Sequence, residues 1–208
     1  MKILAATRSR GKQEEIRRIL VPGGLQVVFP EDIWLRESNE DDALEAADTF
    51  EGNARRKAEY FVRLSSLPTL ADDSGLEVFA LGGAPGVRSK RWAGASGTPV
   101  DVDAANNAEL LRRLAGLSDA QRVARYRCVL VFLRSAGAVP LVCYGDCTGR
   151  ILEAPQGAGG FGYDPLFFSD ELGKTFGDAS AEEKDAVSHR GRALRAFLQA
   201  LKTSVPAS

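Results

Sequence analysis

Short apolar runs alternate along the chain with stretches whose apolar residues recur every three or four positions. The run at residues 3–6 predicts a strand, and Ile16, Ile19 and Leu20 follow it at helical spacing. Residues 27–29 predict a second short strand. Strands that alternate with helices indicate an α/β protein.

A longer helix is predicted next, because its apolar residues form one stripe at helical spacing. The stripe consists of Phe50, Ala54, Ala58, Phe61 and Val62. Asp48 and Glu51, three positions apart, resemble a capping box at the start of this helix. The acidic stretch at residues 34–48 forms the connection that leads into it.

The sequence LADDSG, residues 70–75, sets two carboxylates, Asp72 and Asp73, at the end of an apolar run. The Ser-Gly pair that follows is a turn signal, so this region predicts a strand, a turn and a second strand. A loop rich in glycine and proline, LGGAPGVRSKRWAG, comes next.

The second half of the chain opens with a helix, marked by Leu110, Leu111 and Leu114. Residues 126–133 and 139–152 predict consecutive strands joined by the hairpin-like sequence RSAGA. The sequence APQGAGGFGYDP after them contains too much glycine for regular structure, so it predicts a shaped loop.

The end of the chain predicts helix starts at a capping box, Ser180 with Glu183, and at Ser188 in an N-cap position. The last helix carries its apolar stripe at Leu194, Phe197, Leu198 and Leu201. No linker separates two self-sufficient cores. We therefore expect a single α/β domain over residues 1–208 with a mixed central sheet.

Composition argues against several classes of protein. Lys plus Arg number 27 against 28 acidic residues, so the net charge of −1 gives no bulk reason to expect a nucleic acid or a membrane as partner. The N-terminal apolar run is too short for a secretory signal, and no later run approaches membrane-spanning length. We expect a cytoplasmic protein, with Cys128, Cys143 and Cys147 as small buried side chains.

Asp72 and Asp73 are the first candidates for chemistry. Successive side chains of a strand point to opposite faces, so only one of these carboxylates can line a given site. Buried carboxylates require a cation or a proton, and Mg²⁺ is a common hard cation with oxygen ligands. The alternative is a solvated strand end with an Asx-type turn.

The sequence TRSRGK, residues 7–12, lies between the first predicted strand and the first helix and carries three cations. Backbone N–H groups and the helix dipole favour an anion at such a place. It is not a Walker loop, because G-x-x-x-x-G-K-[ST] is absent. Taken alone, such a loop is more often ordinary surface, but together with a carboxylate pair it suggests a metal-bound phosphoester.

Two further segments suggest recognition of a heterocyclic base. In GGFGYDP, Phe161 and Tyr163 offer flat faces for stacking, and the glycines allow the backbone to approach a ligand; Tyr163 could equally fill the core. In SHRG, His189 and Arg190 are hydrogen-bond donors able to bind a carbonyl oxygen, although a lone His is usually structural.

In this order, the segments resemble the family of noncanonical purine nucleoside triphosphate pyrophosphatases, the house-cleaning enzymes for inosine and xanthosine triphosphates. The resemblance covers nearly the whole chain, through ILAATRSRGK, TFEGNARRKA, LADDSGLEV, LGGAPGVRSKRWAG, RCVLVF, GGFGYDPLFF and EEKDAVSHRGRAL. The chain departs from the family at Ser9, where Asn is usual, and in the sequence EAADTF.

The resemblance implies an enzyme that hydrolyses ITP, dITP and XTP to the monophosphate and pyrophosphate, with Mg²⁺ as cofactor. It also implies an elongated mixed sheet with flanking helices that form two lobes around an active-site cleft, commonly in a homodimer. Asp73 matches the family's general base and, together with Glu45, its metal-binding carboxylates.

The resemblance also assigns the contacts with substrate. The triphosphate positions are matched by Thr7, Arg8, Ser9, Arg10, Gly11, Lys12, Asn53 and Lys57, and a further substrate contact by Ser74. The base-recognition positions are matched by Phe161, Gly162, Tyr163, Asp164, Lys184, His189 and Arg190.

Three other functions compete with this one. A septum-inhibition type of pyrophosphatase shares the architecture but prefers modified pyrimidines, whereas SHRG and GGFGYDP favour a purine. A nucleotide sensor would bind triphosphates without cleaving them, and would gain little from the pair Asp72 and Asp73. An RNA-binding module would use the basic RSKRW segment, but the near-neutral charge argues against it.

Overall fold

The computed structural model describes residues 1–38 and 44–203 and divides into two compact units. Unit 1 comprises Met1–Asp73, Cys128–Gly145 and Arg190–Ser208, and unit 2 comprises Ser74–Arg127 and Asp146–His189. Each unit is built from separate stretches of sequence, because β3, β4 and β5 each contribute residues to both.

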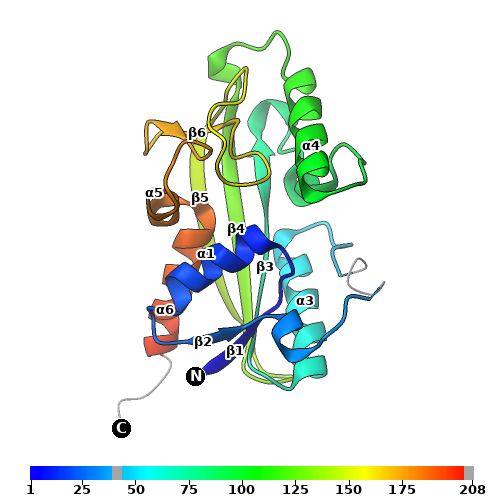
Figure 1. The fold of residues 1–208 in the computed structure, drawn as a ribbon, viewed down its shortest axis with the longest axis vertical. Helices are drawn as coiled ribbons and strands as arrows, with labels where there is room; N and C mark the ends of the chain where they lie inside the picture. The colour runs from blue at the N-terminus through cyan, green and yellow to red at the C-terminus, as the bar shows by residue number, and fades with distance from the viewer. Residues whose placement is uncertain (39–43, 204–208) are drawn as a thin grey trace. The chain divides into compact units, whose positions relative to one another are not determined.

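Figure 1 labels the α-helices and all strands but β7 among the described residues. The strands are β1 (Lys2–Ala5), β2 (Gln26–Val28), β3 (Thr69–Val78), β4 (Val123–Leu133), β5 (Leu141–Ile151), β6 (Phe167–Ser169) and β7 (Lys174–Thr175). The α-helices are α1 (Arg10–Leu20), α3 (Phe50–Ser65), α4 (Pro99–Arg113), α5 (Ala181–Val187) and α6 (His189–Thr203). Short 3₁₀-helices are η1 (Pro30–Ile33), η2 (Phe79–Leu81), η3 (Gly86–Arg91) and η4 (Asp119–Gln121).

Within the described residues, seven strands form a sheet in the order β2-β1-β3-β4-β5-β6-β7. β1 pairs in parallel with β2 and with β3, whereas β6 pairs antiparallel with β5 and with β7. The sheet is therefore mixed, and the predicted α/β class with a mixed central sheet is confirmed. Short parallel pairings at one edge follow from the strand–helix–strand segments at the start of the chain.

Unit 1 has helices on both faces of its strands. Ile3 of β1 and Leu70 of β3 share an apolar cluster with α1 and α6. Their neighbours Leu4 and Ala71 share a second cluster with α3. The period of two along a strand thus divides the side chains between two faces. Helices α1 and α6 lie on one face and α3 on the other (Figure 1).

In unit 2, α4 packs on the strands through leucine side chains. Leu110 of α4 and Leu114, the C-cap residue of this helix, lie in one apolar cluster with Leu76 of β3 and Tyr126 of β4. The Tyr126 ring centroid lies 4.7 Å from that of Phe167 in β6. Residues of α4 one turn before Leu110 therefore face the interior of this unit.

Two local predictions are wrong. No turn follows Asp73, because β3 continues to Val78, where burial of Leu76 and Val78 outweighs the weak Ser-Gly turn signal. The N-cap of α3 is Thr49 and not Asp48; the Thr49 side chain accepts a hydrogen bond from the Gly52 N–H. Part of the acidic connection, residues 39–43, lies outside the described residues.

Other predictions from the sequence are confirmed. Ser180 and Glu183 exchange the two hydrogen bonds of a capping box at the start of α5, and α6 begins directly after Ser188. The three cysteines are buried and free of disulfides. In the described part of the chain, every helix is too short or too polar to span a bilayer.

Candidate active site

Asp73 lies on the face of β3 that α3 covers, the same face as Ala71, and its carboxylate contacts two side chains of α3. Asn53 Nδ2 donates a hydrogen bond to Asp73 Oδ2 at 2.9 Å, and Lys57 Nζ lies 3.5 Å from Asp73 Oδ1. Asn53 is itself held by the Ala47 N–H, which donates to its Oδ1 at 2.8 Å. Asn53 and Lys57 stand one helical turn apart, so both reach the same carboxylate.

Glu45 joins this group through Lys57. Lys57 Nζ lies 3.1 Å from Glu45 Oε1 and therefore stands between the two carboxylates. Burial opposes a charged lysine, but Asp73 and Glu45 raise the pKa of Lys57, so the ammonium stays charged. Burial raises the pKa of Asp73, although Lys57, Lys12 and Asn53 act against this shift.

The predicted metal ligands fit a hard divalent cation. Glu45 and Asp73 direct carboxylate oxygens at one positive centre, the ammonium of Lys57, and oxygen donors are the ligands that Mg²⁺ prefers. Among the described residues no group of three or more His, Cys, Asp or Glu is close enough to form a complete protein cage. Mg²⁺ characteristically takes its remaining ligands from water and substrate phosphates.

Asp72 lies on the opposite face of β3, the same face as Leu70, which α1 and α6 cover. Lys12 Nζ lies 3.0 Å from Asp72 Oδ2, and the Arg190 guanidinium contacts the same oxygen at 3.3 Å. Arg190 also forms an ion pair with Glu15 of α1. The strand alternation thus separates the two adjacent carboxylates into different polar networks, as expected from the sequence.

The Asp72 network is balanced in charge, and all its members except the partly exposed Lys12 are buried. Burial opposes ionisation of Asp72, but Lys12 and Arg190 hold its pKa well below the ordinary value. Arg190 is only 2% exposed. Burial likewise opposes the charge of Arg190, and Glu15 and Asp72 raise the pKa of its guanidinium. Arg190 is therefore fixed by two carboxylates within unit 1.

The loop between β1 and α1 leads into the helix N-terminus. Ser9 is the N-cap of α1, and its side chain makes no capping hydrogen bond, so it does not compete with an anion for the first-turn N–H groups. Thr7 Oγ1 accepts from the Ser9 N–H at 3.3 Å. Arg10 is exposed, and Gly11 follows it in the first turn. Arg8 instead donates to the Leu35 carbonyl at 2.9 Å.

The GGFGYDP loop and α5 form a second polar group, in unit 2. Lys184 Nζ donates to Asp164 Oδ2 at 2.6 Å and lies 4.5 Å from the centroid of the Phe161 ring. The same Asp164 oxygen accepts from the Phe161 N–H at 2.8 Å. Asp164 and Lys184 are buried, whereas Phe161 is partly exposed. The fold therefore brings these three predicted residues together and leaves the Phe161 ring partly exposed at the surface.

Two other predicted base contacts are held by the core of unit 2. Tyr163 is 3% exposed, and its hydroxyl donates to the Ser89 carbonyl at 2.8 Å. His189 stacks on Tyr126, with ring centroids 4.6 Å apart and planes 7° from parallel. Stacking by Tyr163 on a ligand and donation by His189 thus stay predictions, as does the contact assigned to Ser74.

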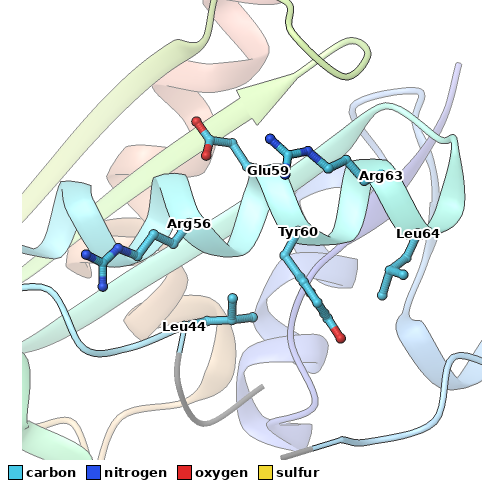
Figure 2. A pocket seen from close by; sticks show the side chains of 6 residues that line it. All are labelled: Leu44, Arg56, Glu59, Tyr60, Arg63 and Leu64. Carbon is cyan, nitrogen blue, oxygen red and sulfur yellow. The ribbon is translucent and has the colours of Figure 1, made fainter. Parts of the chain in front are cut away.

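A surface hollow of about 340 Å³ on α3 is separate from these groups. The side chains around it belong to Leu44, Arg56, Glu59, Tyr60, Arg63 and Leu64 (Figure 2). It contains none of the predicted site residues, and Asn53 and Lys57 of the same helix are buried. We therefore assign the hollow no ligand.

Four polar residues escaped the sequence analysis. Glu15 pairs with Arg190, and Asp103, Asn106 and Asn107 of α4 bind backbone groups of loops in unit 2. The sequence carries a signal for the three residues of α4. Asp103, Asn106 and Asn107 precede Leu110 at helical spacing, which places them on the same face of the helix. Polar side chains on the buried face of a helix require partners.

The family model described as Ham1 matches residues 3–200. The chain belongs to the Ham1 family. The resemblance inferred from its motifs is thereby confirmed, and it extends across both units.

Curated Ham1 relatives carry a specific name. The dITP/XTP pyrophosphatase of Escherichia coli strain K12 is 44% identical over 97% of this chain and 98% of its own length. That of Thermus thermophilus is 45% identical over 99% of this chain and 94% of its own length.

Solved Ham1 structures are also similar. A HAM1 protein from Coxiella burnetii aligns with a TM-score of 0.84 and 33% identity, covering 98% of this chain and 100% of that one. The Staphylococcus aureus Ham1 protein aligns with a TM-score of 0.81 and 32% identity, covering 99% and 100%.

Proposed function

We propose that this chain hydrolyses the noncanonical purine nucleoside triphosphates ITP, dITP and XTP to the nucleoside monophosphate and pyrophosphate. The names of its relatives in Escherichia coli and Thermus thermophilus support the substrate class. The observation that carries the mechanism is the buried carboxylate of Asp73, held by Asn53 and Lys57 and facing the same ammonium as Glu45.

The reaction breaks the bond between the α-phosphorus and the oxygen that bridges it to the β-phosphorus. A water oxygen forms the new bond to the α-phosphorus, Asp73 accepts a proton from that water, and pyrophosphate leaves with the bridging oxygen. Asp73 suits this role because burial raises its pKa, which makes its carboxylate a stronger base than an exposed one. Asn53 fixes its orientation.

Glu45 and Asp73 would hold Mg²⁺, which would supply neutralisation of the phosphate charge when bound. Lys57, which lies between these carboxylates, would donate to a phosphate oxygen. The first-turn N–H groups of α1 and the exposed Arg10 would bind the pyrophosphate part. Lys12, in the first turn of α1, would add positive charge near the same N–H groups while it remains paired with Asp72.

We assign base recognition to Phe161 for stacking and to Lys184 and His189 as donors. Inosine and xanthine carry an oxygen at purine position six, where adenine carries an amino group that would face these donors. Sites built on such hydrogen bonds reject the wrong analogue by up to ~10⁴-fold. Arg190 stays a predicted base contact, and its guanidinium is already paired with Asp72 and Glu15.

We also propose, following the resemblance, that the chain acts as a homodimer in the cytoplasm. Size-exclusion chromatography with light scattering tests the dimer directly, since a mass equal to that of one chain contradicts it.

A substrate panel tests the activity. The purified chain is incubated with Mg²⁺ and, separately, with ITP, dITP, XTP, GTP, ATP and a methylated UTP, and the products are separated by ion exchange. We expect IMP and pyrophosphate from ITP, and loss of turnover when EDTA replaces Mg²⁺. Pyrophosphate no higher than in a reaction without protein rejects the proposal. Faster turnover of methylated UTP than of ITP would assign the pyrimidine type instead.

A further inference from the structure

Helix α4 holds both backbone polar groups of Gly162, in the middle of the GGFGYDP loop. Asp103 Oδ2 accepts a hydrogen bond from the Gly162 N–H at 2.7 Å. Asn107 Nδ2 donates one to the Gly162 carbonyl at 2.9 Å. Gly162 has φ +64°, in the left-handed region that favours glycine, so the loop turns sharply between the two contacts. All three residues belong to unit 2.

The same helix also holds the loop that contains η3. Asn106 Oδ1 accepts from the Ala93 N–H at 2.8 Å, and its Nδ2 donates to the Lys90 carbonyl at 3.0 Å. The η3 segment in turn receives the hydroxyl of Tyr163 at the Ser89 carbonyl. Hydrogen bonds therefore link α4, η3 and the GGFGYDP loop in a closed circuit, which we call the α4 frame.

The α4 frame ends one residue away from the partly exposed ring of Phe161. Gly162 follows Phe161 directly, and the Phe161 N–H is bound by Asp164, which also accepts from Lys184. The position of the Phe161 ring against Lys184 is thus set by backbone contacts on both sides. A loop with this much glycine would otherwise visit many conformations at a high entropic cost.

Packing alone does not account for polar residues at these positions. The face of α4 that meets the core of unit 2 carries Asp103, Asn106 and Asn107 before Leu110. An apolar side chain at these positions would pack there without the desolvation cost of a polar group. Burial raises the pKa of Asp103, because partial removal from water destabilises the charged carboxylate. What these side chains supply instead is directed hydrogen bonding to one loop.

We propose that Asp103 and Asn107 are positioning residues for base recognition, which hold the Gly162 backbone so that Phe161 and Lys184 present a preformed surface to the purine. The inference rests on the proposed function and deepens it. A preformed loop avoids the ordering cost at the moment of binding, so the contribution of Asp103 and Asn107 is to substrate affinity and not to the chemical step.

The test compares Asp103→Leu, Asp103→Asn, Asn107→Leu and, as a matched control on the same helix, Glu109→Gln, whose carboxylate contacts only Arg112 and Arg113 in the described structure. Steady-state kinetics with ITP give KM and kcat separately, and isothermal titration with IMP reports binding without turnover. We expect the two leucine variants to raise the KM for ITP and the Kd for IMP about tenfold, the equivalent of one lost hydrogen bond. Their kcat should change less than about twofold, because Asp73 and its partners are untouched.

Asp103→Asn should restore most of the affinity, because its amide oxygen can still accept from the Gly162 N–H. Circular dichroism checks the folding of each variant, and if Asp103→Leu does not fold, Asn107→Leu decides alone. Kinetics of the leucine variants equal to those of Glu109→Gln overturn the inference, and so does a loss confined to kcat. A parent protein that releases no pyrophosphate from ITP rejects the proposed function instead, while the IMP titration still tests the positioning role.

Discussion

Asn53 Nδ2 donates a hydrogen bond to Asp73 Oδ2 at 2.9 Å, and both side chains are buried. The bond takes one carboxylate oxygen, and the Lys57 ammonium faces the other. A carboxylate held at both oxygens has one orientation toward an incoming water. General-base catalysis depends on that orientation as much as on the pKa of the base.

Replacing Asp73 with Asn should lower the turnover of ITP by at least ~100-fold, because the amide cannot accept a proton. ITP binding should survive, since the Asn53 contact needs only an oxygen at position 73. Stopped assays of pyrophosphate release measure turnover, and equilibrium dialysis measures binding. Asp170→Asn, at an exposed ion pair with Arg150, is the control. Turnover equal to that of the parent would remove Asp73 from the mechanism.

Replacing Lys57 with Met should leave Asp73 and Glu45 as two uncompensated carboxylates, and we expect a loss of about 3 kcal/mol in the free energy of unfolding. Mg²⁺ should recover more stability in this variant than in the parent, because a bound cation replaces the missing ammonium. Melting temperatures with and without Mg²⁺ measure this difference. Arg56→Met, an exposed position on the same helix, serves as control. Equal Mg²⁺ responses in variant and parent would contradict a shared cation site.

Replacing Glu15 with Gln should remove one of the two carboxylates that neutralise Arg190 in the core of unit 1. Breaking a buried ion pair from one side costs about 3–5 kcal/mol, because the remaining charge stays uncompensated. Urea unfolding measures the change. The exposed neighbour offers a matched control, since Glu14→Gln should cost less than about 0.5 kcal/mol. Similar losses in both variants would show that the Arg190 network adds little to stability.

Replacing Gly160 with Ala should weaken ITP binding. Gly160 has φ +74°, and an added Cβ would lie 2.2 Å from Asp164 Oδ2, so the carboxylate that binds Lys184 must move. Gly137 has nearly the same backbone, φ +77°, with nothing within 4 Å of an added Cβ. Gly137→Ala should therefore show only the conformational cost of about 1 kcal/mol. A KM for ITP raised equally in both variants would exclude the steric explanation.

Several features of the fold followed from local patterns. The apolar stripe of α3, the capping box of α5 and the leucines of α6 depend on residues within two or three turns of each other, so a short window contains the whole signal. The separation of Asp72 from Asp73 also followed, because side chains alternate along any strand. The turn predicted after Asp73 failed for the opposite reason. Its local signal lost to the burial of Leu76 and Val78, which depends on the rest of unit 2.

The motifs named candidate site residues but did not predict the contacts that these residues make within the chain. Motif resemblance named Lys12 and Arg190 for phosphate and base, and gave no sign that both meet Asp72. It also missed Asp103, whose partner Gly162 lies 59 positions further along the chain. Such contacts depend on which loops the packed elements bring together.

The order of apolar and polar side chains was enough to specify an α/β class, the helices and the separation of the two aspartates onto opposite faces of a strand, because these properties repeat with the period of one strand or helix. Folding in three dimensions decided the partners. Arg190 pairs with Asp72 across 118 positions and with Glu15 across 175, and their buried charges are stable only because β3, α1 and α6 close around them.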